Sequence, residues 1–281
     1  MNPILKRTLS GLTAGLLVVG LFLYCPLRAL MPIVATLAAL AQLEFYQMAK
    51  AKYEPIAWLG VLMGVVWMAA VGFAGFDRGL VFIPAYGLAL APLTAFALCA
   101  FVTFSPRYKN PVGTVASTLF GFLYVPFLMS FFLLMAQIGA KPYFSGCDSR
   151  TGLYTLFALI AITKFSDTGG FAFGMAFGKH KMCPTISPGK SWEGLAGSVF
   201  GSMLISSAFM PLTSFGFGKS LALGVVAALV GTFGDLVESR FKRECQVKDS
   251  ATFMPAGLGG FLDMFDSLIF APAVLYPFLQ G

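Results

Sequence analysis

The chain has 281 residues, of which 58% are hydrophobic types and 11% are charged, and its formal net charge is +7. Soluble domains carry about 25% charged residues, so this chain has too few polar side chains to cover a soluble core. The composition therefore excludes a soluble fold and predicts an all-α, polytopic transmembrane helical bundle. The positive charge requires no nucleic acid as a partner, because basic loops of membrane proteins attract anionic lipid head groups.

The first apolar run, 12–24, follows Lys6 and Arg7, as the apolar part of a signal peptide would. No A-x-A-type cleavage site follows it closely and a second apolar run begins at once, so we expect a retained helix. About 20 apolar residues cross a bilayer as a helix. On this basis we expect about nine transmembrane helices, at 8–25, 29–48, 56–75, 80–103, 112–137, 152–176, 194–213, 219–237 and 258–279.

The basic residues predict how these helices are oriented. With the N-terminus in the cytoplasm, the external segments contain only Arg28, Arg78, Lys141, Arg150 and Lys219. The cytoplasmic segments contain Lys6, Arg7, Lys50, Lys52, Arg107, Lys109, Lys179, Lys181, Lys190, Arg240, Lys242, Arg243 and Lys248. Cytoplasmic loops carry an excess of Lys and Arg. We therefore expect a multi-pass protein of the cytoplasmic (inner) membrane, with its long polar stretches, 179–193 and 238–256, in the cytoplasm.

The acidic residues divide the chain into two regions. Eight of the 12 acids follow residue 166, namely Asp167, Glu193, Asp235, Glu238, Glu244, Asp249, Asp263 and Asp266. Ionisable residues are costly within a bilayer and tend to mark functional sites. We therefore expect N-terminal transmembrane helices within 1–140 and a catalytic transmembrane region within 150–281.

Three of these acids flank the last two predicted spans. Asp235 ends the eighth span, whereas Asp263 and Asp266 open the ninth with a spacing that places them on one helix face. Carboxylate oxygens at a cytoplasmic boundary suit Mg²⁺, which typically uses one or two carboxylates together with substrate phosphates. Helix capping is the alternative for Asp263 and Asp266, but it does not suit Asp235 at a helix end. We therefore expect a metal site.

Lys242, Arg243 and Lys248 lie between these acids, in a predicted cytoplasmic loop. Carboxylates, a metal and cations together are typical of phosphoryl or nucleotidyl transfer. An ordinary basic loop is the alternative, and the neighbouring intramembrane acids favour the functional reading. Upstream, Gly189-Lys190-Ser191 resembles the last three residues of a P-loop. Pro184 stands where a P-loop requires a glycine, and no predicted strand precedes it, so a P-loop is excluded.

Together, these segments resemble the phosphatidate cytidylyltransferase family, also called CDP-diacylglycerol synthases. The resemblance rests on Ser239, Phe241, Lys242, Arg243, Lys248 and Asp249, followed by Pro255, Gly259, Gly260, Phe261, Asp263, Phe265 and Asp266. The segments 166–169 and 187–194 also look like segments of the family. Two family residues are missing: Gly257 and Leu258 stand around the place of a histidine, and Met264 replaces an arginine.

The resemblance implies that CTP and phosphatidic acid react to give CDP-diacylglycerol and pyrophosphate with Mg²⁺, in a possible homodimer. The catalytic residues are expected to be Asp235, Lys242 and Asp263, and the metal ligands Asp235, Asp263 and Asp266. The substrate-binding residues are expected to be Asp167, Ser187, Lys190, Glu193, Ser239, Arg243, Lys248 and Asp249. Among the cations, we expect Lys242 and Arg243 at the reacting phosphates, with Lys190 and Lys248 nearer the nucleotide.

Three other functions remain open from the sequence. The chain could be a cytidylyltransferase for another lipid phosphate, such as an archaeol-type or polyprenol phosphate. It could be an ion-coupled transporter, although a transporter would have acids at corresponding places in two halves. The missing histidine also leaves room for a non-catalytic lipid-binding relative.

Overall fold

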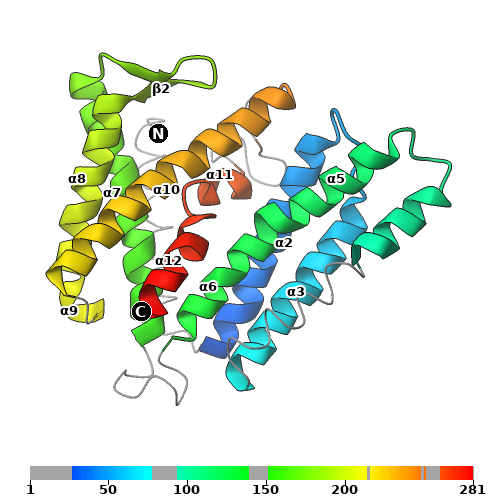
Figure 1. The fold of residues 1–281 in the computed structure, drawn as a ribbon, viewed down its shortest axis with the longest axis horizontal. Coiled ribbons are helices and arrows are strands. Elements are labelled where there is room, and N and C mark those ends of the chain that lie inside the picture. The colour runs from blue at the N-terminus through cyan, green and yellow to red at the C-terminus, as the bar shows by residue number, and fades with distance from the viewer. Residues whose placement is uncertain are drawn as a thin grey trace, which may run out of the picture.

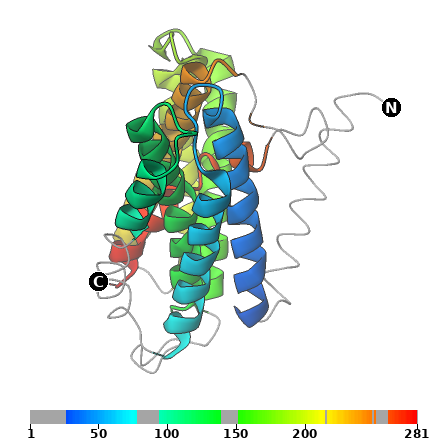
Figure 2. The same ribbon diagram turned by 90° about the vertical axis from the view of Figure 1, so that its right-hand side faces the viewer.

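The computed structural model describes residues 27–77, 94–138, 151–213, 216–247, 250 and 260–280. The predicted first span, 8–25, lies outside these ranges. The described part is a helical bundle that departs from helix mainly in one short β-hairpin. Two groups of helices lie side by side along its long axis (Figure 1). The hairpin projects from one end of the bundle, and the C-terminus and α9 lie near the opposite end (Figures 1 and 2).

The first group contains the helices of the N-terminal half. These are α2 (Leu27–Ala49), α3 (Ala57–Asp77), the helix Thr94–Thr103, α5 (Pro111–Phe122) and α6 (Leu128–Ala136). A π-helical turn, η2 (Leu123–Phe127), joins α5 to α6 and contains Pro126. Proline removes one backbone donor from a helix, and a widened turn keeps the two segments continuous. Together they form one apolar path from Pro111 to Ala136 that is long enough to cross a membrane.

The second group contains most of the C-terminal half. It consists of α7 (Thr151–Phe177), β1 (Lys181–Cys183), β2 (Ser187–Ser191), α8 (Trp192–Ala208), α9 (Met210–Thr213) and α10 (Phe217–Glu244). The strands β1 and β2 are antiparallel. Glycines bring α7 and α8 into backbone contact: a Cβ at Gly169 would lie 2.5 Å from the carbonyl oxygen of Gly197. Small residues thus allow α7 and α8 to pack closely.

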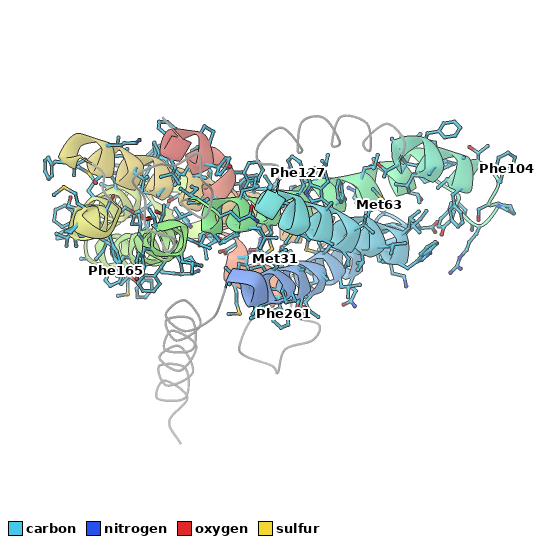
Figure 3. The ribbon with its side chains drawn as sticks, turned by 90° about the horizontal axis from the view of Figure 1, so that it is seen from below. Met31, Met63, Phe104, Phe127, Phe165 and Phe261 are labelled. Atoms are coloured by element: carbon cyan, nitrogen blue, oxygen red, sulfur yellow. The ribbon has the colours of Figure 1, made fainter. Side chains whose placement is uncertain are left out.

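Four described helices are long and apolar enough to cross a membrane: Ala29–Ala49, Pro111–Ala136, Thr151–Phe177 and Phe217–Glu244. Two shorter apolar helices, Ala57–Gly72 and Thr94–Thr103, lie within the predicted spans 56–75 and 80–103. Large apolar side chains point outward at both sides of the bundle, as Phe104 and Phe165 illustrate (Figure 3) with exposed fractions of 87% and 52%. The all-α membrane fold is therefore confirmed, while the count of nine crossings remains a prediction.

Two predicted span boundaries are wrong. The eighth span does not end at Asp235, because α10 continues as helix to Glu244. The ninth is not one helix but two, α11 (Phe261–Phe265) and α12 (Ala271–Gln280). Proline in the interior of a continuous helix would lose a hydrogen bond, whereas it fits the first turn of a new helix. Pro272 lies in the first turn of α12, which is consistent with the break.

Candidate active site

A cavity of about 560 Å³ lies among α7, α8, α10 and the β-hairpin. Its wall combines apolar and charged side chains, which makes it unlike a lipid-filled groove between apolar helices. The lining residues are Asp167, Gly170, Phe171, Gly174, Met175, Lys181, Met182, Ser187, Gly189, Lys190, Ser191, Gly194, Leu195, Ser198, Thr232, Asp235 and Asp266. Five predicted site residues, Asp167, Ser187, Lys190, Asp235 and Asp266, are thus brought to one cavity.

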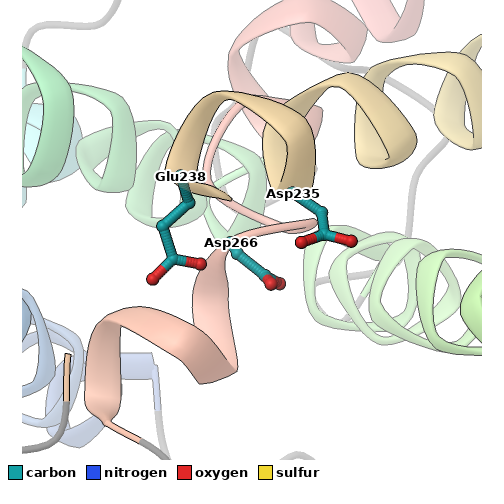
Figure 4. Close-up of side chains that lie close together, drawn as sticks. All are labelled: Asp235, Glu238 and Asp266. Carbon is teal, nitrogen blue, oxygen red and sulfur yellow. The ribbon is translucent and has the colours of Figure 1, made fainter. Parts of the chain in front are cut away.

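Three carboxylates converge beside this cavity (Figure 4). Asp235 and Glu238 lie on α10, and Asp266 directly follows α11. One oxygen from each of the three lies within 4.8 Å of the others. Glu238 is completely buried, whereas Asp235 and Asp266 are half-buried. The arrangement can hold a small cation through oxygen atoms alone, which is the ligand chemistry of Mg²⁺.

Asp263 takes a different place from the one expected. Its carboxylate forms an ion pair with Lys242 and accepts a hydrogen bond from the Gly260 amide at 2.7 Å. The group of converging oxygens contains Glu238 instead of Asp263. Asp266 is the C-cap residue of α11 and keeps helical backbone angles. Both aspartates face α10, where Asp263 pairs with Lys242 and Asp266 lies near Asp235 and Glu238.

Lys242 connects Asp263 to the acidic group. Its ammonium nitrogen lies 3.1 Å from Oε1 of Glu238, one turn earlier on α10, and also contacts Asp263. Lys242 and Arg243 belong to the last turn of α10, not to the loop that the sequence predicted. The Lys242 side chain is 15% exposed and does not line the cavity, so its charge acts on the neighbouring carboxylates first.

Lys190 links the hairpin to α10. Its ammonium nitrogen lies 2.5 Å from Oδ2 of Asp235, so the cation faces the same carboxylate that belongs to the acidic group. Lys164 and Asp167, one turn apart on α7, form an ion pair at 3.8 Å. Asp167 also accepts a hydrogen bond from Ser267 at 3.0 Å, which joins α7 to the turn after α11.

Other predicted residues surround this core. Ser239 donates a hydrogen bond to Oδ1 of Asp235 at 3.4 Å, and Arg243 donates one to the Ile186 carbonyl at 3.4 Å. Glu193 lies at the start of α8, outside the four long apolar helices. Its Oε1 lies 2.6 Å from Nδ1 of His180, and this contact links the two sides of the hairpin at its base. The hydrogen bond from His180 lowers the pKa of the Glu193 carboxyl to about 2. Lys248 and Asp249, together with the site of the missing histidine, lie outside the described residues.

Glu238 is the main site residue that the sequence analysis did not assign. It lies one turn after Asp235 and one turn before Lys242, so the i,i+3 and i,i+4 spacings contain the signal. A span that ends at Asp235 hides this spacing, because Glu238 then lies outside the helix. Once α10 continues as helix, all three side chains fall on one face.

Comparison with known proteins shows which family the chain matches. The sequence profile described as "Cytidylyltransferase family" matches residues 5–281, which is nearly the whole chain. The chain belongs to this family. Three relatives of this cytidylyltransferase family member carry the name phosphatidate cytidylyltransferase.

The relative from Mycobacterium bovis is 33% identical over 276 residues, which cover 92% of this chain and 82% of the relative. The relative from Chlamydia trachomatis is 35% identical over 185 residues, or 62% of this chain and 58% of the relative. The relative from Staphylococcus aureus strain COL is 39% identical over 153 residues, or 53% and 58%. The matches thus cover less than two thirds of the chlamydial and staphylococcal proteins.

Proposed function

We propose that the protein transfers the cytidylyl group of CTP to phosphatidic acid, giving CDP-diacylglycerol and pyrophosphate for phospholipid biosynthesis. One observation carries the proposal: a single cavity combines carboxylates and lysines with apolar side chains of membrane helices. Phe171 and Met175 on the long apolar helix α7 suit lipid chains, whereas Lys190 and Asp235 suit a nucleotide and its counterion. Membership of the cytidylyltransferase family supports this reading.

We propose Mg²⁺ as the cofactor, held by Asp235 and Asp266 with Glu238 beside them. The donor set fits: it consists of oxygen atoms only, and they approach within 4.8 Å of one another. A divalent cation here would neutralise the triphosphate and stabilise charge that develops at the reacting phosphorus. Asp263 would act through Lys242, because the two form an ion pair beside Glu238.

In the proposed reaction, a phosphate oxygen of phosphatidic acid attacks the α-phosphorus of CTP. The bond from that phosphorus to the bridging α,β-oxygen breaks, and pyrophosphate leaves with the electron pair. Both reactants are anions, so cationic groups must offset their repulsion. Lys190 on the hairpin lines the cavity and would contact the CTP phosphates. Lys242 would hold the neighbouring acids in place. The sequence predicted instead that Lys242 contacts the reacting phosphates directly.

We propose that the site faces the cytoplasm from the inner membrane. The hairpin, the C-terminal ends of α2 and α10 and the N-terminal end of α5 lie toward one end of the bundle, whereas α10 begins near the other end (Figure 1). In the sequence, Lys181, Lys50, Arg240 and Lys109 belong to or adjoin the first set of segments, and Lys219 lies at the start of α10. This distribution agrees with an inward orientation of the basic end. In a background in which the five native cysteines are replaced by serine, a Lys109→Cys variant should react with an impermeant maleimide in inside-out vesicles and not in intact cells. Assembly as a homodimer stays a prediction.

The decisive experiment is an assay of the purified protein in nanodiscs with CTP, phosphatidic acid and MgCl₂, following CDP-diacylglycerol and pyrophosphate together. Equal amounts of both products, lost on chelation by EDTA and restored by Mg²⁺, are expected. Other lipid phosphates, assayed in parallel, test the alternative substrate class. Absence of product with every lipid phosphate would contradict the proposal and favour the non-catalytic lipid-binding or transporter alternative.

A further inference from the structure

One acid of the N-terminal half reaches the catalytic region. Glu44 lies on α2, within the membrane-spanning segment Ala29–Ala49, and its side chain is completely buried. A buried carboxylate inside a membrane span is costly and tends to be functional. It does not line the cavity that carries Lys190 and Asp235, so direct contact with substrate does not explain it.

The carboxylate of Glu44 contacts the backbone of α11. Its Oε2 accepts a hydrogen bond from the amide of Leu262 at 2.9 Å, across 218 positions of sequence. The first amides of a helix have no acceptor within that helix, so Leu262 needs an external one. The side chain of Leu262 is itself completely buried, which leaves water poorly placed to replace Glu44.

Everything that α11 contributes to the site depends on its position. The helix has five residues, too few to hold its own place by internal hydrogen bonding. Asp263 is adjacent to Leu262 and pairs with Lys242, and Asp266 follows the helix and meets Asp235 and Glu238. A shift of α11 along its axis or away from α2 would move both aspartates relative to α10.

We propose that Glu44 is a positioning residue of the active site, which holds α11 by the Leu262 amide so that Asp263 and Asp266 stay in register with α10. This inference rests on the proposed function for its effect on turnover. The hydrogen bond from Leu262 to Glu44 joins the two regions into which the acids divide the sequence. Through it, the N-terminal helices hold the short helix that contains Asp263 and precedes Asp266. The essential property of Glu44 is its reach to the amide, not its charge.

Two variants separate reach from charge. Glu44→Gln keeps an oxygen acceptor at the same distance and removes the charge. Glu44→Asp keeps the charge and withdraws the acceptor by one methylene. Displacement of catalytic groups by about 1 Å can cost about 10²-fold in rate. We therefore expect Glu44→Asp to lower kcat by about 10²-fold, with KM for CTP changed by less than about threefold, and Glu44→Gln to stay within about threefold of the unmodified protein.

Gln42→Leu is the matched control. Gln42 is also completely buried on α2, but its amide donates to Tyr46 and to the Gly60 carbonyl, within the N-terminal group. It should lower thermal stability and leave the kcat of the folded fraction within about threefold. An equal fall in kcat for Gln42→Leu and Glu44→Asp would overturn the inference, because both would then act through general destabilisation.

Hydrogen–deuterium exchange of the 260–266 segment supplies a readout that does not need turnover. We expect faster exchange of this segment in Glu44→Asp and unchanged exchange in Glu44→Gln and Gln42→Leu. Unchanged exchange in Glu44→Asp, or loss of activity in Glu44→Gln with normal exchange, would overturn the positioning role. If the unmodified protein makes no CDP-diacylglycerol, the proposed function fails, while the exchange data still decide whether Glu44 holds α11.

Discussion

The N-terminal group and the cavity region differ in how their polar side chains are paired. In the N-terminal group, Gln42 donates to Tyr46, and Tyr46 donates to the carbonyl of Thr118 at 2.7 Å, so neutral partners satisfy one another within the group. In the C-terminal group, charged side chains pair across elements, as Lys190 does with Asp235. Neutral buried hydrogen bonds stabilise packing. Charges facing a cavity can exchange their partners for a ligand, so the second group is the one suited to chemistry.

The largest expected effect comes from Asp235→Asn. It removes a carboxylate charge that both the acidic group and Lys190 use. Loss of about 4 kcal/mol of transition-state stabilisation corresponds to roughly a 10³-fold fall in kcat. Nanodisc assays with size-exclusion profiles measure this against Glu54→Gln, a matched change at an exposed acid. Near-normal turnover of Asp235→Asn would remove Asp235 from the site.

Lys242→Gln should lower both stability and turnover. Glu238 is completely buried, so loss of the ammonium group leaves a carboxylate without its cation, which costs about 3–5 kcal/mol in buried pairs. Thermal unfolding in nanodiscs should therefore shift downward, and kcat should fall by about 10²-fold. The double variant Lys242→Gln/Glu238→Gln should regain much of the stability but not the turnover. Unchanged stability of Lys242→Gln would contradict the supporting role given to this lysine.

Lys190→Gln should chiefly affect the nucleotide. Its cation lines the cavity without being buried as deeply as Glu238, so we expect KM for CTP to rise about tenfold while kcat falls less than about threefold. Steady-state kinetics with CTP and phosphatidic acid varied separately measure this. Lys179→Gln, at an exposed lysine between α7 and the hairpin that does not line the cavity, is the control. Small, matching losses in Lys190→Gln and Lys242→Gln would indicate that the cations only set topology and attract anionic lipid.

Tyr46→Phe should have the smallest effect on activity. It deletes the hydroxyl that donates to Thr118 and accepts from Gln42 at 3.0 Å. Leaving buried groups unsatisfied costs about 1–3 kcal/mol each, so the unfolding temperature should fall while KM and kcat of the folded protein stay unchanged. Tyr53→Phe, at a half-buried tyrosine in the turn after α2, should change neither. A strong kinetic effect of Tyr46→Phe would contradict the assignment of packing to the N-terminal group and of chemistry to the C-terminal group.

Composition and hydropathy were enough to predict the helical membrane fold, because the cost of burying polar groups in lipid acts on every span. The clustering of acids after residue 166 also located the cavity residues Asp167, Asp235 and Asp266. Helix ends were less predictable. A polar helical turn, such as the one from Glu238 to Arg243, looks like a loop when apolar length is the only guide.

Contacts between distant segments could not be derived from spacing. The exchange of Asp263 for Glu238 in the acidic group depends on how α11 packs against α10. The hydrogen bond from Leu262 to Glu44 joins opposite ends of the sequence. Local periodicity contains no information on such pairs, and they decide which carboxylate faces which cation.

The ion pair between Lys190 and Asp235 also bears on how the proposed cation and nucleotide affect each other's affinity. A cation placed among the acids competes with the ammonium of Lys190 for the carboxylate of Asp235, whereas a triphosphate competes with Asp235 for Lys190. Each ligand would therefore displace the side chain that competes with the other ligand. By linkage, whatever factor the nucleotide adds to the affinity for the cation, the cation must add to the affinity for the nucleotide. A side-chain contact on a two-stranded hairpin would thus make the proposed nucleotide and cation mutually cooperative, without any need for a large domain movement.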